Sequence, residues 1–330
     1  MIEMGERLIG RYTGQLKGPL MICLGGMHGN ESAGVEALTL LLKMIEVEPI
    51  TNPDFQFRGR IVAFKGNVRA LEKGVRFFKN DLNRIWKPET IERVVATPIW
   101  ELKHEELELR ELIEACHEEI EDYQPEQIVI LDLHTTSCEG GIFSIVREDL
   151  ESIELGIELH APVIRGMMTG LNGTTLHYFH QSNFQTPITS IVFESGQHDN
   201  PLSINRAIAA TINCLRTTGH VRAEHVENVH DQLLISHSRD LPKVAQLMYY
   251  HHIEDGDEFK MEPGYTNFDA VKKDEVLAQD RHGPIKAKQD GLLLMPLYQE
   301  QGQDGFFIIE KHDPSTLPKR KKVAAYIGLQ

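Results

Sequence analysis

Almost continuously apolar short segments alternate with helical patterns through the first 215 residues of this chain. Because such segments lack a polar face, they are typical of strands buried on both faces of a mainly parallel sheet. The expected strands lie at residues 20–24, 60–64, 128–131 and 190–193. Apolar residues at helical spacing predict helices at residues 33–42, 109–120 and 203–215. The pattern therefore favours an α/β fold whose sheet is flanked by helices.

The pattern of apolar and turn-forming residues changes after about residue 240. Short apolar stretches at 245–250, 291–298 and 306–309 are separated by Gly, Pro, Asp and Lys, which is typical of a small, mostly β region. We therefore expect a mainly parallel or mixed sheet flanked by helices, followed by a smaller β-rich C-terminal domain. The expected domains cover residues 1–240 and 241–330.

Charge and cysteine usage restrict the partners and the compartment. The 330 residues include 34 Lys and Arg against 49 Asp and Glu, a formal net charge of −15. This balance argues against nucleic acid or an anionic membrane as the main partner, because both carry negative charge. The four cysteines lie far apart, and no run of about 18 apolar residues occurs. We therefore expect a cytoplasmic protein with reduced thiols and no membrane span.

Residues of metal-binding types stand where three of the expected strands end. The first strand runs into Gly25-Gly-Met-His28-Gly-Asn-Glu31, the third reaches His134, and the fourth ends at Glu194. In open α/β sheets, ligands bind outside the carboxyl ends of the strands. Two histidines and a glutamate, with one short and one long spacer, match the three protein ligands of a catalytic zinc site, which leaves a fourth position for water.

Each of these residues also has an ordinary structural interpretation. His28 and Glu31 could be an incidental polar pair at a helix start, where a carboxylate suits the helix dipole. His134 could be a hydrogen-bonded residue at a strand end. Asp132 lies two residues before His134 and points to the same side of the strand, either to orient a ligand histidine or to make a buried hydrogen bond. Their joint position at strand ends, beside Glu194, favours a metal site.

The order of four motifs is more specific than any one motif. The motifs are His28-Gly-Asn-Glu31, Arg76-Phe-Phe-Lys-Asn-Asp-Leu-Asn83-Arg84, Asp132-Leu-His134 and Glu194. In this order the chain resembles the succinylglutamate desuccinylase/aspartoacylase family of the zinc carboxypeptidase superfamily, over roughly residues 20 to 200. The resemblance implies a carboxypeptidase-like catalytic domain, one zinc ion per chain held by His28, Glu31 and His134, and a C-terminal domain that partly covers the active site.

The resemblance also implies roles for four further residues. Glu194 matches the carboxylate that takes a proton from the zinc-bound water and passes it to the leaving amine. Arg76 matches the arginine that polarises the scissile carbonyl and stabilises the oxyanion. Asn83 and Arg84 match the pair that binds the carboxylate of the amino-acid half of the substrate. Outside this motif, Arg76 and Arg84 would be interpreted as solvated surface charges.

One segment departs from the family pattern. Family members that act on N-acetylaspartate place a Tyr and an Arg ahead of the catalytic Glu, to hold the substrate's side-chain carboxylate. Here no Lys or Arg occurs between Arg165 and Glu194, and residues 177–183 offer histidines, a tyrosine and amides instead. We therefore expect N-acetylaspartate to be a poor substrate. The C-terminal domain could still supply a cation, from Arg281, Lys286 or Lys288.

These observations predict a zinc-dependent amidohydrolase that releases the acyl group of an N-acyl amino acid or related small N-acylated amine. The alternatives are a carboxypeptidase-type peptidase and a zinc-binding regulatory module without catalysis. Imidazole and carboxylate ligands would also accept cobalt or manganese. The sequence leaves a homo-oligomer open.

Overall fold

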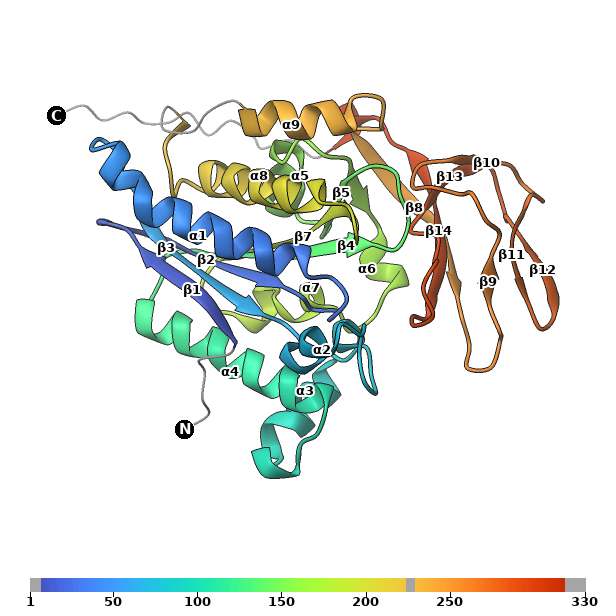
Figure 1. Cartoon of the computed structure of the whole chain (residues 1–330), viewed down its shortest axis with the longest axis horizontal. Coiled ribbons are helices and arrows are strands. Elements are labelled where there is room, and N and C mark those ends of the chain that lie inside the picture. The colour runs from blue at the N-terminus through green and yellow to red at the C-terminus, as the bar shows by residue number, and fades with distance from the viewer. Residues whose placement is uncertain (1–6, 224–228, 318–330) are drawn as a thin grey trace.

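The computed structural model describes residues 7–223 and 229–317. Strands and helices alternate up to about residue 240, and short strands follow (Figure 1). The strands are β1 (Leu8–Thr13), β2 (Leu16–Gly25), β3 (Arg58–Lys65), β4 (Ile128–Thr136), β5 (Phe143–Val146), β6 (Val163–Arg165), β7 (Ile188–Gln197), β8 (Val244–His252), β9 (Lys260–Met261), β10 (Ala270–Val271), β11 (Val276–Asp280), β12 (Gly283–Lys286), β13 (Gly291–Leu294) and β14 (Asp304–Lys311). The α-helices are α1 (Ala33–Thr51), α2 (Val68–Lys73), α3 (Pro88–Ala96), α4 (Glu105–Tyr123), α5 (Leu150–Glu158), α6 (Met167–Gly170), α7 (Thr175–Tyr178), α8 (Leu202–Thr217) and α9 (Val229–Ser238).

Eleven of the described strands form one mixed sheet, in the order β1-β3-β2-β4-β7-β5-β6-β8-β14-β13-β10. In the middle, β3, β2, β4 and β7 run parallel to one another. β1 and β5 are antiparallel to β3 and β7, respectively. The predicted α/β fold with a mainly parallel or mixed sheet is confirmed. Because the central strands are parallel, the carboxyl ends of β2, β4 and β7 meet at one edge of the sheet.

Helices cover both faces of the sheet, because its central strands are apolar on both sides (Figure 1). On β2, Met21 and Cys23 pack in the core beneath α1, α5 and α8. Leu20, Ile22 and Leu24 point to the other face and pack against α3 and α4. All five side chains are fully buried. None of the described helices is long and apolar enough to cross a membrane.

The C-terminal strands extend the same sheet. β8 pairs in parallel with β6, with Val163 opposite Val244, and β14 pairs antiparallel with β8. β12, β11 and β9 form a separate three-stranded sheet at the far end of the molecule (Figure 1). The predicted β-rich C-terminal region is therefore present. The domain division at residue 240 stays a prediction, since the large sheet runs across it.

Candidate metal centre and active site

His28 and Glu31 lie in the loop between β2 and α1. This loop requires glycine at two positions: Gly26 has φ +69°, and a Cβ at Gly29 would lie 2.1 Å from the carbonyl carbon of Ala70. The Glu31 amide donates to the His28 carbonyl, and His28 Nδ1 lies 2.8 Å from Glu31 Oε1. Both side chains are buried. The tightly packed loop thus presents two potential metal ligands at the carboxyl end of β2.

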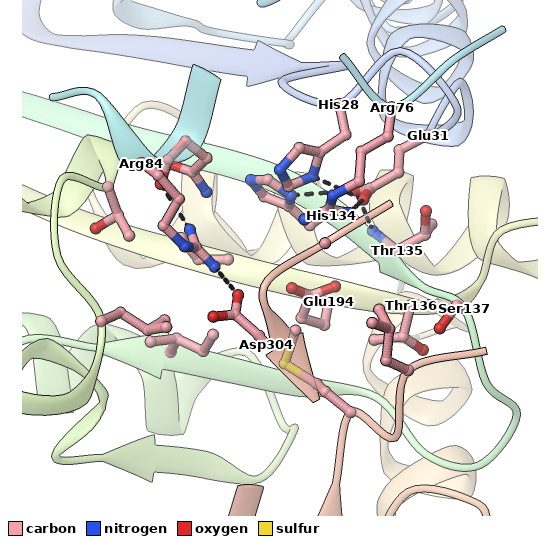
Figure 2. Close-up of a pocket in the computed structure, with 18 of the residues that line it drawn as sticks. His28, Glu31, Arg76, Arg84, His134, Thr135, Thr136, Ser137, Glu194 and Asp304 are labelled. Atoms are coloured by element: carbon pink, nitrogen blue, oxygen red, sulfur yellow. Dashed lines mark hydrogen bonds and ion pairs between the residues drawn. The ribbon is translucent and has the colours of Figure 1, made fainter. Parts of the chain in front are cut away.

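His134 adds a third potential ligand from β4. Its Nδ1 lies 3.1 Å from Oε2 of Glu31, and its ring packs edge-on against that of His28, with 5.1 Å between centroids. One ligand atom from each of the three residues lies within 4.8 Å of the others. Figure 2 shows the three side chains converging from two different elements. Two imidazoles and one carboxylate form a donor set typical of catalytic zinc.

A carboxylate faces the other ring nitrogen of each histidine. His28 Nε2 lies 3.0 Å from Asp81 Oδ1, and His134 Nε2 lies 3.1 Å from Asp132 Oδ2. Such partners orient a metal-binding imidazole and leave its remaining nitrogen to coordinate. The spacing to His134 predicts Asp132, whereas sequence reasoning misses Asp81. Asp81 lies within the motif that runs from Arg76 to Arg84, but only the fold brings it to His28.

The charges around the cluster favour the ionised forms of the Glu31 and Asp81 carboxyl groups. Burial alone would raise the pKa of Glu31, but the charge of His28 and the hydrogen bond with His134 outweigh burial and hold the pKa well below its usual range. Burial likewise opposes ionisation of Asp81, yet His28 and Arg76 hold the pKa of Asp81 well below its usual value. Because a carboxylate coordinates a cation in its ionised form, Glu31 is ready to act as a ligand.

Glu194 lies beside His134. β4 and β7 are paired so that His134 stands opposite Glu194, which places both side chains at the same edge of the sheet. Glu194 is buried, and its Oε2 has no hydrogen-bond partner among the described residues. Burial, assisted by the negative charges of Glu31 and Asp132, raises the pKa of Glu194 to about 8. A buried carboxyl group that exchanges a proton near neutral pH is suited to general acid–base catalysis.

Arg76 borders the same cluster. Its Nη1 lies 3.3 Å from Glu31 Oε1, and its Nη2 lies 3.1 Å from Asp81 Oδ2. The backbone carbonyl of Arg76 accepts a hydrogen bond from the Gly29 amide, so the two motifs are held side by side. The structure therefore places a guanidinium next to the potential metal ligands (Figure 2).

Asn83 and Arg84 occupy a short 3₁₀ turn, Leu82–Arg84, on another side of the pocket. The Asn83 side-chain oxygen accepts a hydrogen bond of 3.0 Å from the amide of Thr175. The Arg84 guanidinium forms an ion pair with Asp304, the first residue of β14 (Figure 2). Both residues that the resemblance assigns to substrate binding line the pocket, but a carboxylate of the protein itself already faces Arg84.

These side chains surround a pocket that opens to solvent. One part of its wall is polar and contains the histidine–glutamate cluster, Glu194 and both arginines. Another part is apolar, and the C-terminal region contributes to it. The apolar lining consists of Ile145, Met168, Leu171, Leu176, Val192, Met295 and Leu297. The pocket can therefore hold a molecule that has both a polar reacting group and an apolar portion.

The catalytic-domain model of the succinylglutamate desuccinylase/aspartoacylase family matches residues 17–186, which is more than half of the chain. The chain belongs to this family. The match includes the motifs that contain His28, Arg76 and His134, whereas Glu194 lies beyond it. The resemblance drawn from the four motifs is confirmed at the level of the family, and the roles of individual residues stay predictions.

Named members of the family are similar to short parts of the chain. A succinylglutamate desuccinylase from Pseudomonas fluorescens is 38% identical over 66 residues, which are 20% of this chain and 18% of that protein. A protein named probable aspartoacylase, from Nostoc sp., is 27% identical over 123 residues, or 37% of each chain. The chain thus matches well under half the length of these relatives.

Solved structures of the desuccinylase/aspartoacylase family extend the likeness to most of the chain. The crystal structure of the succinylglutamate desuccinylase from Chromobacterium violaceum superimposes with a TM-score of 0.58, at 16% identity, over 90% of this chain and 85% of that one. At this identity the likeness shows the fold. It therefore supports the predicted fold class, including the C-terminal β region.

Sequence reasoning does not identify the pocket residues of the C-terminal region. Arg281, Lys286 and Lys288, the cations considered there, are exposed and do not line the pocket. Asp304 does line it, and so does Gln299, whose Oε1 lies 3.2 Å from His198 Nε2. No local motif marks these positions, because their place in the pocket depends on how the C-terminal strands pack against the family's catalytic domain.

Proposed function

We propose that this family member is a zinc-dependent deacylase that hydrolyses the amide bond of an N-acyl amino acid or a related small N-acylated amine. The observation that carries the proposal is the buried cluster of His28, Glu31 and His134 with Glu194 beside it. The names of the relatives, desuccinylase and aspartoacylase, support amide hydrolysis.

The donor set fits zinc. Two imidazole Nδ1 atoms and one ionised carboxylate would hold the ion, while Asp81 and Asp132 orient the two rings. A zinc ion with three protein ligands acts as a Lewis acid toward a carbonyl group and makes water acidic enough to ionise near neutral pH.

Glu194 and Arg76 would perform the remaining steps. Glu194, with a free Oε2, accepts the proton of the attacking water and then donates it to the leaving amine, which departs as a neutral product. Burial raises the pKa of Glu194 and so favours holding that proton for the amine, whereas the charge of a bound zinc ion would lower the pKa and leave the carboxylate free to accept the proton first. The Arg76 guanidinium, held in place by Glu31 and Asp81, stabilises the negative charge that develops on the carbonyl oxygen.

The rim of the pocket favours small substrates over peptides. Asn30 Nδ2 donates to Gln299 Oε1 at 2.8 Å, and Gln301 Nε2 donates to the Phe77 carbonyl at 3.1 Å. These contacts connect the C-terminal region to the loops around the cluster and narrow the approach, which argues against a carboxypeptidase-type peptidase. Glu194 and Arg76 beside a full ligand set argue against a non-catalytic regulatory module. A cytoplasmic location and a homo-oligomer stay predictions.

A substrate panel tests the proposal. Purified protein is incubated with acetylated and succinylated amino acids and amines, and with dipeptides, and release of primary amine is measured. We expect release from at least one N-acyl compound, loss of activity with a chelator and recovery on adding zinc. Preferential hydrolysis of the dipeptides would indicate a peptidase. Zinc binding without hydrolysis of any compound would indicate a regulatory module.

A further inference from the structure

We propose that Asp304 determines specificity by occupying the anion site on Arg84, so that the pocket prefers N-acyl amines that have an apolar substituent and no carboxylate next to the amide nitrogen. The inference rests on the proposed deacylase function and narrows its substrate class. Figure 2 shows Asp304 between Arg84 and Glu194, and Asp304 is one of the residues that line the pocket.

The Arg84–Asp304 pair is largely buried. Only 18% of the Arg84 side chain and 11% of the Asp304 side chain are exposed. Oδ1 of Asp304 also accepts a hydrogen bond of 2.6 Å from the hydroxyl group of Tyr250 on β8, and Nη1 of Arg84 donates to the Asn83 carbonyl at 2.6 Å. Displacing Asp304 from the Arg84 guanidinium costs free energy, because the Asp304 carboxylate would then be buried without its cation in a medium of low polarity. A substrate carboxylate would therefore compete poorly for Arg84.

The backbone of β14 aims Asp304 at this position. The pairing of β14 with β8 shifts between Asp304, which is opposite His252, and Phe306, which is opposite His251. Such an irregularity changes the direction of a side chain relative to a regular strand. The residue between them is Gly305, where a Cβ would lie 2.8 Å from Cδ2 of His251. The geometry thus directs Asp304 into the pocket.

Apart from Arg76, no lysine or arginine besides Arg84 lines the described part of the pocket. Arg76 is the second arginine of the lining, and its guanidinium already faces Glu31 and Asp81. A carboxylate on the substrate would find each arginine of the lining already facing a carboxylate of the protein, whereas an alkyl group would meet Met168, Leu171, Leu176, Met295 and Leu297.

A matched pair of ligands tests the inference. N-acetylleucine and N-acetyl-3-methylbutylamine differ only in the carboxylate, and both kcat/KM and the dissociation constant are measured for each. Dissociation constants are taken with zinc-loaded Glu194→Gln protein, so that binding is read without turnover. We expect the parent to favour the amine derivative, and Asp304→Asn to shift the ratio toward N-acetylleucine by roughly 10- to 100-fold, the range of a hydrogen bond to a charged group.

Two variants control this comparison. Asp290→Asn removes the same charge from an exposed residue that contacts Lys272, and it should leave the ratio unchanged. Tyr250→Phe loosens Asp304 without removing it and should shift the ratio in the same direction by less. A parent that prefers N-acetylleucine, or a ratio that moves less than about threefold in Asp304→Asn, would overturn the inference. Binding that follows the expected ratio without hydrolysis of any substrate would instead refute the deacylase function and leave the role of Asp304 standing.

Discussion

The two walls of the pocket are built in different ways. The metal wall takes its side chains from the carboxyl ends of β2, β4 and β7, neighbouring strands of one sheet. The C-terminal wall comes from β14 and the residues before it, which reach the pocket only because β14 packs against β8. The metal wall contains the groups that we propose perform hydrolysis. The C-terminal wall contains apolar side chains, Gln299 and one carboxylate, and we propose that these groups select the substrate.

The comparison predicts that substitutions can change hydrolysis and substrate selectivity separately in this protein. On the metal wall, each histidine has a carboxylate behind it and Glu194 lies in register with His134, so the groups depend on one another. On the C-terminal wall, Asp304 contacts Arg84 and Tyr250 but none of the potential metal ligands in the described hydrogen-bond network. Substitutions in the two walls should therefore affect different measurements.

The largest effect is expected from His134→Ala, which removes a metal ligand. Zinc content measured by elemental analysis should fall far below one ion per chain, and hydrolysis should fall to background. Circular dichroism should show that most of the fold remains, because the cores on both sides of the sheet do not include this residue. Full zinc occupancy in the variant would remove His134 from the set of ligands.

Glu194→Gln is expected to have the next largest effect. The amide keeps the shape of the side chain but cannot accept the proton, so turnover should fall by roughly 10²–10⁴-fold. Zinc content should not change, which separates this variant from His134→Ala. Turnover at the parental rate would mean that another group moves the proton, and His198, which also lines the pocket, would be examined next.

Asp81→Asn and Asp132→Asn should weaken zinc binding without abolishing it. Each removes the negative charge behind a ligand histidine, and loss of such a partner typically lowers metal affinity by about 10–100-fold. Competition with a zinc chelator of known affinity measures the change. Asp290→Asn, an exposed aspartate far from the cluster in sequence, is the matched control and should keep the parental affinity. Unchanged affinity in both variants would limit Asp81 and Asp132 to structural hydrogen bonds.

Tyr250→Phe should have the smallest effect and should sharpen the contrast between the walls. Loss of one hydrogen bond to Asp304 should lower the free energy of unfolding by about 1–2 kcal/mol. Zinc affinity should be unchanged, because the Tyr250 hydroxyl group contacts Asp304 of the C-terminal wall and none of the potential metal ligands among the described hydrogen bonds. Denaturant unfolding and chelator competition on the same preparation test both statements. Weakened zinc binding would show that the two walls are coupled.

Much of the metal wall can be predicted from the sequence. Apolar runs predict the buried strands. Polar side chains directly after such runs stand out from the pattern, and this identifies His28, His134 and Glu194 as candidate site residues. The two-residue spacing predicts that the side chains of Asp132 and His134 lie on the same side of β4. In the structure, Asp132 Oδ2 lies 3.1 Å from His134 Nε2. This reasoning does not predict the role of Asp81, because no rule of sequence spacing connects Asp81 to His28, 53 positions earlier.

What the sequence determines by itself is the fold class and the residues that can bind a metal, because local pattern sets the strands and parallel strands must bring their carboxyl ends together. What only the tertiary structure decides is the partner of Arg84. That contact joins residues 220 positions apart and depends on the irregular pairing of β14 around Gly305. A shift of one residue in a strand reverses the direction of its side chains, so no local pattern could place Asp304 in the pocket. The residues proposed for catalysis can thus be identified from local sequence, whereas the contact proposed to set selectivity depends on long-range packing.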